Sequence, residues 1–250
     1  MSSDSVAPAE QPPVGHMVGR SDDPMAIVTG SSNGIGQALA EALLAQGWRV
    51  LGLDAAPPTL QHPGFEAVRI DLTDAAQLAA LAPRLAQADA LIHAAGVLRV
   101  GPLGALDADA GALMWKLHVD AATALANVVL PAMAQRGAGR VLFVGSRVSQ
   151  GMPGRSQYAG TKAALVALAR SWAAEVVAQQ VTVNVISPAA TQTAMLSDPS
   201  RTGSMPRLPP LGRYIQPAEI AALALFLLSP AAAAITGQDI AVCGGASLPQ

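Results

Sequence analysis

The feature that most constrains this chain is a glycine-rich turn between a short apolar run and a helical segment. Residues 26–29 form the apolar run, and residues 29–36 then read TGSSNGIG. Gly30 permits a tight turn, Gly34 lets the backbone approach an anion, and Gly36 lets the helix pack close to the strand. The N-terminal amides of such a helix favour a bound phosphate. This order of strand, glycine turn and helix therefore predicts a nucleotide-binding βα unit.

Short β-branched runs alternate with longer alanine-rich amphipathic segments along the rest of the chain. This alternation is typical of βα units that build a parallel sheet. We expect strands at Ala26–Thr29, Arg49–Leu53, Ala67–Ile70, Ala90–Ala94, Val141–Val144, Val181–Ile186 and Ile240–Val242. We expect helices at Gly36–Ala45, Ala75–Leu85, Gly111–Met133, Ala159–Ala178 and Ala218–Leu228. The predicted fold class is α/β, a Rossmann-type, doubly wound, parallel seven-stranded sheet with helices on both faces.

The length of the chain favours one domain. Its 250 residues are 51% hydrophobic, enough to bury one large core. Residues 1–24 lack the apolar segment of a secretory signal and are expected to form a disordered tail before a single domain at residues 25–250. Residues from about 194 to 212 are rich in Pro, Ser and Arg, which predicts a loop over a site.

Composition argues against several classes of protein. The 15 basic and 17 acidic residues include no long basic run, so nucleic acid is not an expected partner. A single cysteine, Cys243, and four histidines predict neither a disulfide nor a metal site. The longest apolar stretch that we recognise, Ile220–Leu228, is shorter than the roughly 20 residues that span a bilayer. We expect a soluble, cytoplasmic protein without membrane partners.

A carboxylate at the end of the second predicted strand indicates the type of dinucleotide. Asp54 lies about 20 residues beyond the glycine turn, where the ribose hydroxyls of a dinucleotide belong. A carboxylate accepts hydrogen bonds from a ribose diol and repels a 2′-phosphate, and no basic residue is expected nearby. The sequence therefore favours NAD over NADP. Alternatively, Asp54 only caps the turn that continues into Pro57 and Pro58.

Three side chains near the fifth predicted strand form a candidate proton-transfer site. Tyr158 and Lys162 are one helical turn apart, so they project from the same helix face. A neighbouring ammonium favours the phenolate of a tyrosine, whose reference pKa is about 10. Ser146 follows the strand at the carboxyl edge of the sheet, where its hydroxyl can hold a substrate oxygen. Each also has an ordinary structural interpretation, as a surface pair or a cap.

Together these residues give the chain a clear resemblance. From Met25 to Leu248 it resembles the short-chain dehydrogenase/reductase family in its glycine turn, Asp71-Leu72, Ala95-Gly96, Ser146, Tyr158 and Lys162. The resemblance implies that Tyr158 is the general acid/base, that Lys162 assists it and holds the nicotinamide ribose, and that Ser146 orients the carbonyl. The implied cofactor is NAD, held by Gly30, Ser32, Asn33, Gly34, Ile35, Gly36, Asp54, Asp71, Leu72, Ala94, Ala95, Gly96, Tyr158, Lys162, Pro188, Ala189, Thr191 and Thr193.

Three departures from the family pattern are visible. His118 stands where the family usually has an Asn that anchors a water chain to the active lysine, and Ala189 replaces a customary Gly. The interval from Ser146 to Tyr158 is one residue shorter than the commonest spacing, and Ser149 is a fallback for the serine role. We hypothesise that a neutral His118 takes part in the proton relay and adds a titration to the acid limb of the pH profile. The alternative is that it only packs in the helix.

The segment from His93 to Gly101 looks most similar to family members of the 2,3-dihydro-2,3-dihydroxybenzoate dehydrogenase type. Such enzymes oxidise a cyclic diol carboxylate with NAD. Met152 is then a candidate substrate contact, and Arg99 is a candidate contact for an anionic group, with further positive charge from Arg147, Arg155, Arg201 and Arg207. These arginines can equally be solvated loop residues. A ketoreductase working in the reductive direction is one alternative, and a non-catalytic NAD-binding protein is another.

The predicted long helices also bear on assembly. Gly111–Met133 and Ala159–Ala178 carry apolar residues beyond one narrow stripe, which indicates a second buried face. Members of the family that the chain resembles are commonly homotetramers built on such helices. We therefore expect a symmetric homo-oligomer, most simply a homotetramer.

Overall fold

Seven parallel strands form one sheet at the centre of the molecule. The computed structural model describes residues 23–197 and 207–248. The strand order is β3-β2-β1-β4-β5-β6-β7, and every neighbouring pair is parallel. The strands are β1 (Met25–Thr29), β2 (Arg49–Asp54), β3 (Phe65–Arg69), β4 (Ala90–His93), β5 (Gly139–Val144), β6 (Val181–Pro188) and β7 (Asp239–Val242). Strands β4, β5 and β6 are buried along their whole length, as expected for a sheet covered on both faces.

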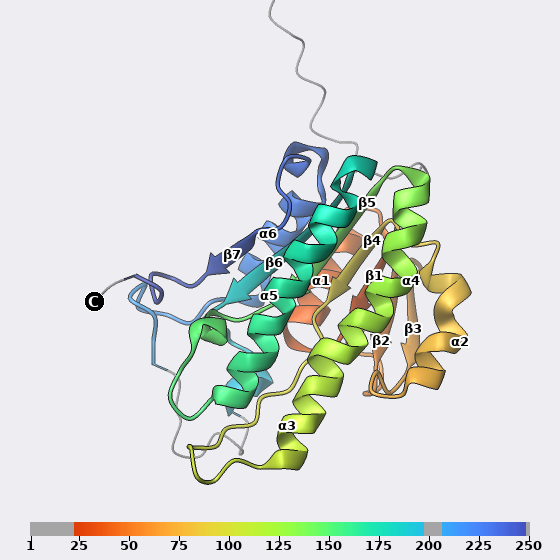
Figure 1. Ribbon diagram of the computed structural model, residues 1–250. Coiled ribbons are helices and arrows are strands. Elements are labelled where there is room, and N and C mark those ends of the chain that lie inside the picture. Colours follow the sequence, from red (N-terminus) through yellow and green to blue (C-terminus); the bar gives the residue numbers. More distant parts are fainter. Residues whose placement is uncertain (1–22, 198–206, 249–250) are drawn as a thin grey trace, which may run out of the picture.

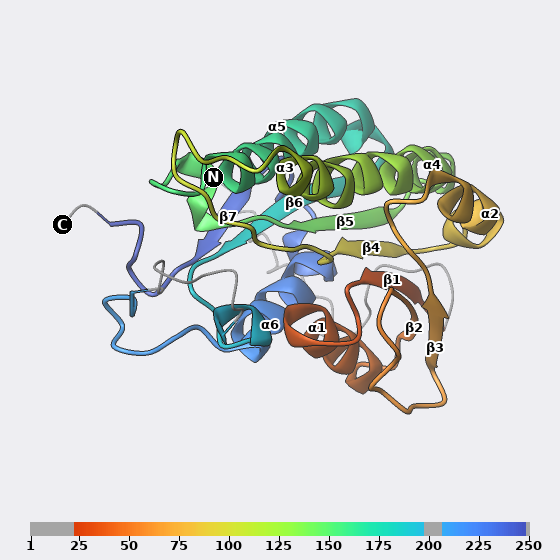
Figure 2. The ribbon, with the colours of Figure 1, turned by 90° about the horizontal axis from the view of Figure 1, so that it is seen from below.

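Helices cover both faces of the sheet (Figures 1 and 2). On one face, α1 (Gly34–Ala45) packs beside α6 (Pro217–Leu228), which appears below the sheet with it in Figure 2. The other face carries α2 (Ala75–Leu85), α3 (Ala108–Trp115), α4 (Ala121–Arg136) and α5 (Ser156–Val176). Each helical layer has its own buried apolar cluster against the sheet. The result is the predicted single-domain, doubly wound α/β fold.

The order in which successive strands are added reverses at β1, which pairs with β2 on one side and β4 on the other. In an open sheet wound this way, the loops after the two strands part and leave a crevice at the carboxyl edge. All seven predicted strands and the five predicted helices are confirmed, with ends shifted by a few residues. The described residues also form short helical turns at Arg147–Gln150, Val177–Gln179, Ala194–Ser197 and Pro230–Ala232.

The predicted helix Gly111–Met133 is longer than expected and contains an irregularity. It runs from Ala108 to Arg136 as α3, a π-helical segment at Lys116–Asp120, and α4. This helix is long and apolar enough to cross a membrane by length and composition alone, a feature that the sequence analysis missed. Half of its most apolar window is buried inside the fold, as in the core helix of a globular protein.

Two predicted segments fall largely outside the described residues. The N-terminal tail is described only at Asp23, which forms an ion pair with Arg49, and at Pro24. In the loop predicted at about 194–212, residues 194–197 form a 3₁₀ turn, and the description resumes at Arg207.

Candidate active site

One large pocket of about 1200 Å³ opens at the carboxyl edge of the sheet. Almost all of the predicted site residues line it: Gly30, Asn33, Gly34, Ile35, Gly36, Asp54, Asp71, Leu72, Ala94, Ala95, Gly96, Ser146, Met152, Tyr158, Lys162, Pro188, Ala189, Thr191 and Thr193. Ser32, His118 and Arg99 are not among the lining residues. The fold therefore gathers side chains from distant parts of the chain around one cavity.

The glycine turn closes one end of the pocket and leaves no room for side chains. A Cβ atom on Gly36 would lie 2.0 Å from the carbonyl oxygen of Gly30, and one on Gly30 would lie 2.9 Å from the Cα of Ala95. Gly30 also has a φ of 69°, in the left-handed region. Asn33 caps α1 without a side-chain hydrogen bond. The N-terminus of α1 at the pocket is therefore suited to an anion.

Asp54 connects the end of β2 to the glycine turn. Its Oδ2 accepts a hydrogen bond from the amide of Ser32, and its Oδ1 accepts one from the amide of Ala56, both at 2.9 Å. Asp54 also lines the pocket, so the turn-capping role and a position suited to ligand binding occur together. Ser32 is buried and helps to fix this carboxylate from outside the lining.

The expectation that no basic residue lies near Asp54 is wrong. Arg69, the last residue of β3, is paired with Asp54 in the sheet register. Its Nε donates a hydrogen bond to the carbonyl oxygen of Ala55 at 3.0 Å. The two residues are far enough apart in sequence that the proximity arises only from the pairing of β2 with β3. A cation therefore stands beside the carboxylate that was expected to exclude a 2′-phosphate.

Thr29 and His93 hold the segment opposite the glycine turn, a pair that the sequence analysis did not identify. The Thr29 hydroxyl oxygen accepts hydrogen bonds from the amides of Ala94 and Ala95 at 3.0 Å and lies 2.9 Å from Nδ1 of His93. The hydroxyl proton must therefore point to Nδ1, which leaves the ring proton on Nε2. Burial and, to a smaller extent, the charge of Lys162 lower the pKa of His93 to about 3, which favours the neutral ring. A histidine inside the otherwise apolar strand β4 was the available signal.

Tyr158 and Lys162 come from successive turns of α5, as predicted. Both side chains are buried, and the Lys162 Nζ lies 5.8 Å from the centre of the Tyr158 ring. Nζ donates a hydrogen bond to the carbonyl oxygen of Val144 at 2.8 Å, which fixes the ammonium at the end of β5. Burial lowers the pKa of Lys162 to about 7.

Ser146 follows β5 and lines the same pocket. Its Oγ accepts a hydrogen bond from the amide of Val148 at 3.2 Å, so Ser146 also caps the 3₁₀ turn Arg147–Gln150. The structural interpretation of this serine as a cap is correct, and it is compatible with a position in the pocket beside Tyr158. The fallback residue Ser149 does not line the pocket.

His118 lies in the π-helical segment and joins two parts of the site. Its Nε2 accepts a hydrogen bond from the amide of Val97 at 3.0 Å, so the ring proton is on Nδ1, which lies 2.8 Å from the Thr161 hydroxyl oxygen. Thr161 in turn donates to the carbonyl oxygen of Tyr158. Burial and the charge of Lys162 lower the pKa of His118 far below its ordinary value. This shift favours the neutral ring that we hypothesise and does not favour an added titration on the acid limb.

The other half of the pocket is mainly apolar with arginines at its wall. Met152 lies there, as predicted, and so do Arg147, Arg155 and Arg207. Arg99 lies outside the lining and donates a hydrogen bond to the carbonyl oxygen of Leu98. Arg201 is outside the described residues. Among the described residues, no group of three or more His, Cys, Asp or Glu could hold a metal ion.

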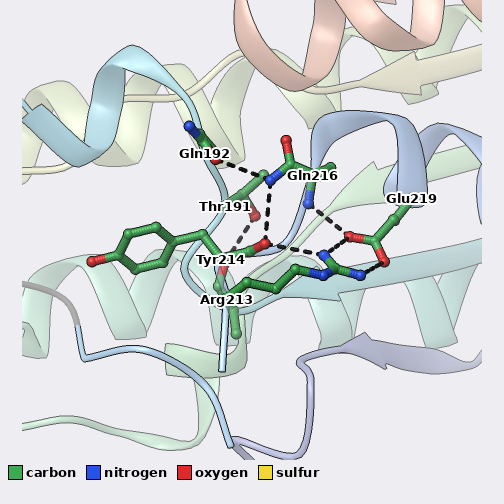
Figure 3. Close-up of polar contacts among 7 residues, drawn as sticks. Thr191, Gln192, Arg213, Tyr214, Gln216 and Glu219 are labelled. Carbon is green, nitrogen blue, oxygen red and sulfur yellow. Dashed lines mark hydrogen bonds and ion pairs between the residues drawn. The ribbon is translucent and has the colours of Figure 1, made fainter. Parts of the chain in front are cut away.

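A polar network holds the segment after β6 in place (Figure 3). Thr191 and Ile215 form an isolated parallel bridge, and the side chain of Gln216 donates to Oε1 of Gln192 at 3.0 Å. Glu219 accepts the amide of Gln216 and a two-pronged contact from Arg213. The network fixes the backbone that presents Thr191 and Thr193 to the pocket.

Comparisons with known proteins agree with this geometry. The family profile described as enoyl-(acyl carrier protein) reductase matches residues 30–247. The 3-oxoacyl-[acyl-carrier-protein] reductase of Salmonella typhimurium is 32% identical over 235 residues, which is 88% of this chain and 96% of the relative. The 2,3-dihydro-2,3-dihydroxybenzoate dehydrogenase of Escherichia coli is 36% identical over 238 residues, with the same two coverages. A solved structure described as a short chain dehydrogenase/reductase family protein is 30% identical, has a TM-score of 0.81, and covers 90% of this chain and 98% of its own.

We expect the buried ammonium of Lys162 to make the stability of the cofactor-free protein depend on pH. Its pKa is about 7 in the folded state against 10.5 for the exposed group, so the unfolded chain binds more protons between these values. The free energy of unfolding should therefore rise with pH through this window, by at most about 1.4 kcal/mol per pH unit. Urea denaturation from pH 6.5 to 9.5 measures the rise. Lys162→Met should remove most of the rise above pH 7.5, where the buried histidines no longer contribute, whereas replacement of the exposed Lys116 by Met should leave it unchanged.

We expect His118 to act through position rather than through titration. His118→Leu leaves the Val97 amide and the Thr161 hydroxyl without their partner, which should lower the free energy of unfolding by about 1–3 kcal/mol. His118→Asn should restore part of this loss. In both variants the acid limb of the pH–rate profile should keep the midpoint of the parent enzyme. A His118 ring that is neutral across this pH range contributes no titration that its replacement could remove. A shifted midpoint in His118→Asn would instead support the relay hypothesis.

Proposed function

The chain belongs to the short-chain dehydrogenase/reductase family, and we propose that it is an NAD-dependent dehydrogenase that oxidises a secondary alcohol to its ketone. The family comparisons support an oxidoreductase that acts on a CH–OH group with a nicotinamide cofactor. The observation that carries the proposal is the convergence of Ser146, Tyr158 and Lys162 in the pocket that the glycine turn closes. Because both catalytic groups are present on α5, we favour an enzyme over a non-catalytic NAD-binding protein.

In this proposal, the chain's own residues handle the proton. Ser146 holds the substrate oxygen by a hydrogen bond, and the phenolate oxygen of Tyr158 accepts the hydroxyl proton. The positive charge of Lys162 stabilises that phenolate, and the Val144 carbonyl keeps the ammonium in place. When bound, the nicotinamide would supply the acceptor for the hydride that leaves the carbon bearing the hydroxyl group. The reverse reaction returns the proton from Tyr158 to the oxygen of a ketone, which is the reductive alternative.

The dinucleotide would lie along the carboxyl edge of β1, β2 and β4. The glycine turn and the N-terminus of α1 would hold its pyrophosphate. Asp54 would accept the ribose hydroxyls, Asp71 and Leu72 would flank the adenine, and Ala94–Gly96 would support the cofactor from the opposite wall. At the other end Thr191 and Thr193, together with Pro188 and Ala189, would hold the carboxamide. NAD is our choice because Asp54 lines the pocket and Arg69 does not.

A cyclic diol or a hydroxy acid is our proposed substrate type. The likeness to the 2,3-dihydro-2,3-dihydroxybenzoate dehydrogenase of Escherichia coli supports the oxidative direction. The likeness to 3-oxoacyl-[acyl-carrier-protein] reductases supports reduction of a ketone. We also propose a cytoplasmic homotetramer. Helices α4 and α5 remain our candidates for the subunit contacts, because they pack on one face of the sheet and each has an outer surface.

The role of Tyr158 can be tested by removing only its hydroxyl. Tyr158→Phe should lower turnover at least about 100-fold, because the proton then has no acceptor. The affinity for NAD should stay within about twofold of the parent, since the ring still fills its place beside His118. Steady-state kinetics and calorimetric titration with NAD measure the two effects. Near-normal turnover in this variant would contradict the proposed mechanism.

The choice of cofactor can be tested at Asp54 and Arg69. The parent enzyme should prefer NAD over NADP by at least about tenfold in kcat/KM, because the Asp54 carboxylate repels a 2′-phosphate. Asp54→Ala should shift the preference toward NADP, because Arg69 already stands beside the vacated position. Asp54→Ala combined with Arg69→Met should lose the shift. Equal use of NAD and NADP by the parent would refute the assignment of Asp54.

A further inference from the structure

The negatively charged and the arginine side chains that line the pocket lie in different halves of it. The two carboxylates, Asp54 and Asp71, follow β2 and β3 at one end of the sheet. The arginines Arg147, Arg155 and Arg207 lie on segments that follow β5 and β6, on the other side of β1 in the strand order. Among the described lining residues, this second half contains no carboxylate. The half of the pocket around Ser146 therefore carries positive charge alone.

Arg147 is a pocket-lining arginine whose side chain has no hydrogen bond or ion pair among the described residues. It directly follows Ser146 and is half-buried, and its Nε is buried without a hydrogen-bond partner. Arg213, by comparison, pairs with Glu219, and the Arg136 guanidinium donates to the Ala86 and Ala88 carbonyls. A buried guanidinium donor without a partner is costly, and a ligand or a water molecule that accepts its hydrogen bond would offset this cost.

The walls around Arg147 are suited to a compact apolar body. The described lining residues of this half are mostly aliphatic or thioether side chains: Leu98, Leu113, Leu117, Val148, Met152 and Met195. A neutral polyol such as a sugar would leave its hydroxyls facing these side chains without hydrogen-bond partners. An aliphatic or cyclic body with one charged end suits both the walls and the arginine.

We propose that Arg147 is a substrate-anchoring residue that binds a carboxylate lying a few bonds from the carbon that is oxidised. This inference rests on the proposed function and names the substrate class of the same site, an apolar hydroxy acid or its keto acid. Ser146 and Arg147 are consecutive, with Cα atoms about 3.8 Å apart, and both line the pocket, so one small molecule in the pocket can contact both residues. In an acyl thioester attached to a carrier, the phosphate of the linking group is many bonds from the reacting carbonyl. A small acid therefore fits the short spacing between Ser146 and Arg147 better. The guanidinium can hold a carboxylate through paired hydrogen bonds.

The test compares acids with neutral isosteres on the full-length enzyme with NAD. The substrates are 2-, 3- and 4-hydroxycyclohexanecarboxylate and the corresponding carboxamides. We expect kcat/KM for the best acid to exceed that for its amide by at least about tenfold, mostly through KM. Arg147→Met should remove this advantage by lowering kcat/KM for the acid to about the value for the amide in the same variant. Arg147→Lys should restore part of the advantage, because the charge returns without the planar fork. Arg49→Met, a matched change on the ion pair with Asp23, should leave the advantage intact.

The outcomes separate the two levels of the proposal. Equal kcat/KM for acids and amides in the parent enzyme would overturn the anchoring role of Arg147 but not the proposed dehydrogenase function. Better turnover of a 3-hydroxyacyl thioester than of any acid would have the same consequence. If no alcohol is oxidised, the proposed function fails, and calorimetry on the enzyme with NADH then decides the anchoring role by itself. Benzoate that binds at least about tenfold more tightly than benzamide, and only when Arg147 is present, would support the anchor. Absence of that difference would overturn it.

Discussion

The close approach of backbone to backbone at the glycine turn is the constraint on which the other features of the site depend. Gly36 lies so near the Gly30 carbonyl that no Cβ fits between them, and Gly30 lies almost as tightly against Ala95. These contacts fix α1 against β1 and bring the segment after β4 to the same edge of the sheet. A parallel sheet that is covered on both faces then leaves only its carboxyl edge open for a ligand. The position of the pocket is therefore a consequence of backbone packing rather than of any single side chain.

Buried polar groups complete the site from three directions. Thr29 connects β1 to the segment after β4, His118 connects the helix containing the π segment to α5, and Lys162 connects α5 to the end of β5. Each contact satisfies a backbone amide or carbonyl that would otherwise be buried without a partner, which would be expensive in this environment. The same bonds determine which ring nitrogen of each histidine carries its proton. Positioning and electrostatics in this site are consequently set by the same few interactions.

Hydrophobic periodicity was enough to predict all seven strands and the two helical layers, because both faces of the sheet must be covered by apolar side chains. The glycine turn, Ser146, Tyr158 and Lys162 could be assigned to one edge because parallel strands end together. The proximity of Arg69 to Asp54 could not be predicted, since it depends on the register between β2 and β3. The pairing of Thr29 with His93 and the π segment around His118 were missed for a similar reason. Both are set by contacts between elements, and the local sequence shows only that His93 is a polar residue in an apolar strand, not which residue it meets.

The network drawn in Figure 3 holds the backbone around Thr191 and Gln192 against the backbone that leads into α6. The bridge between Thr191 and Ile215 closes the segment between them at its base, next to the start of α6. Because the two ends of this segment are held together, we expect the free energy of folding to depend only weakly on the number of residues between them. Insertions, deletions and substitutions between Thr193 and Arg213 should therefore accumulate without disturbing the sheet. Natural variation or directed evolution could therefore redraw the range of accepted substrates in this segment while the chemistry at Tyr158 is retained.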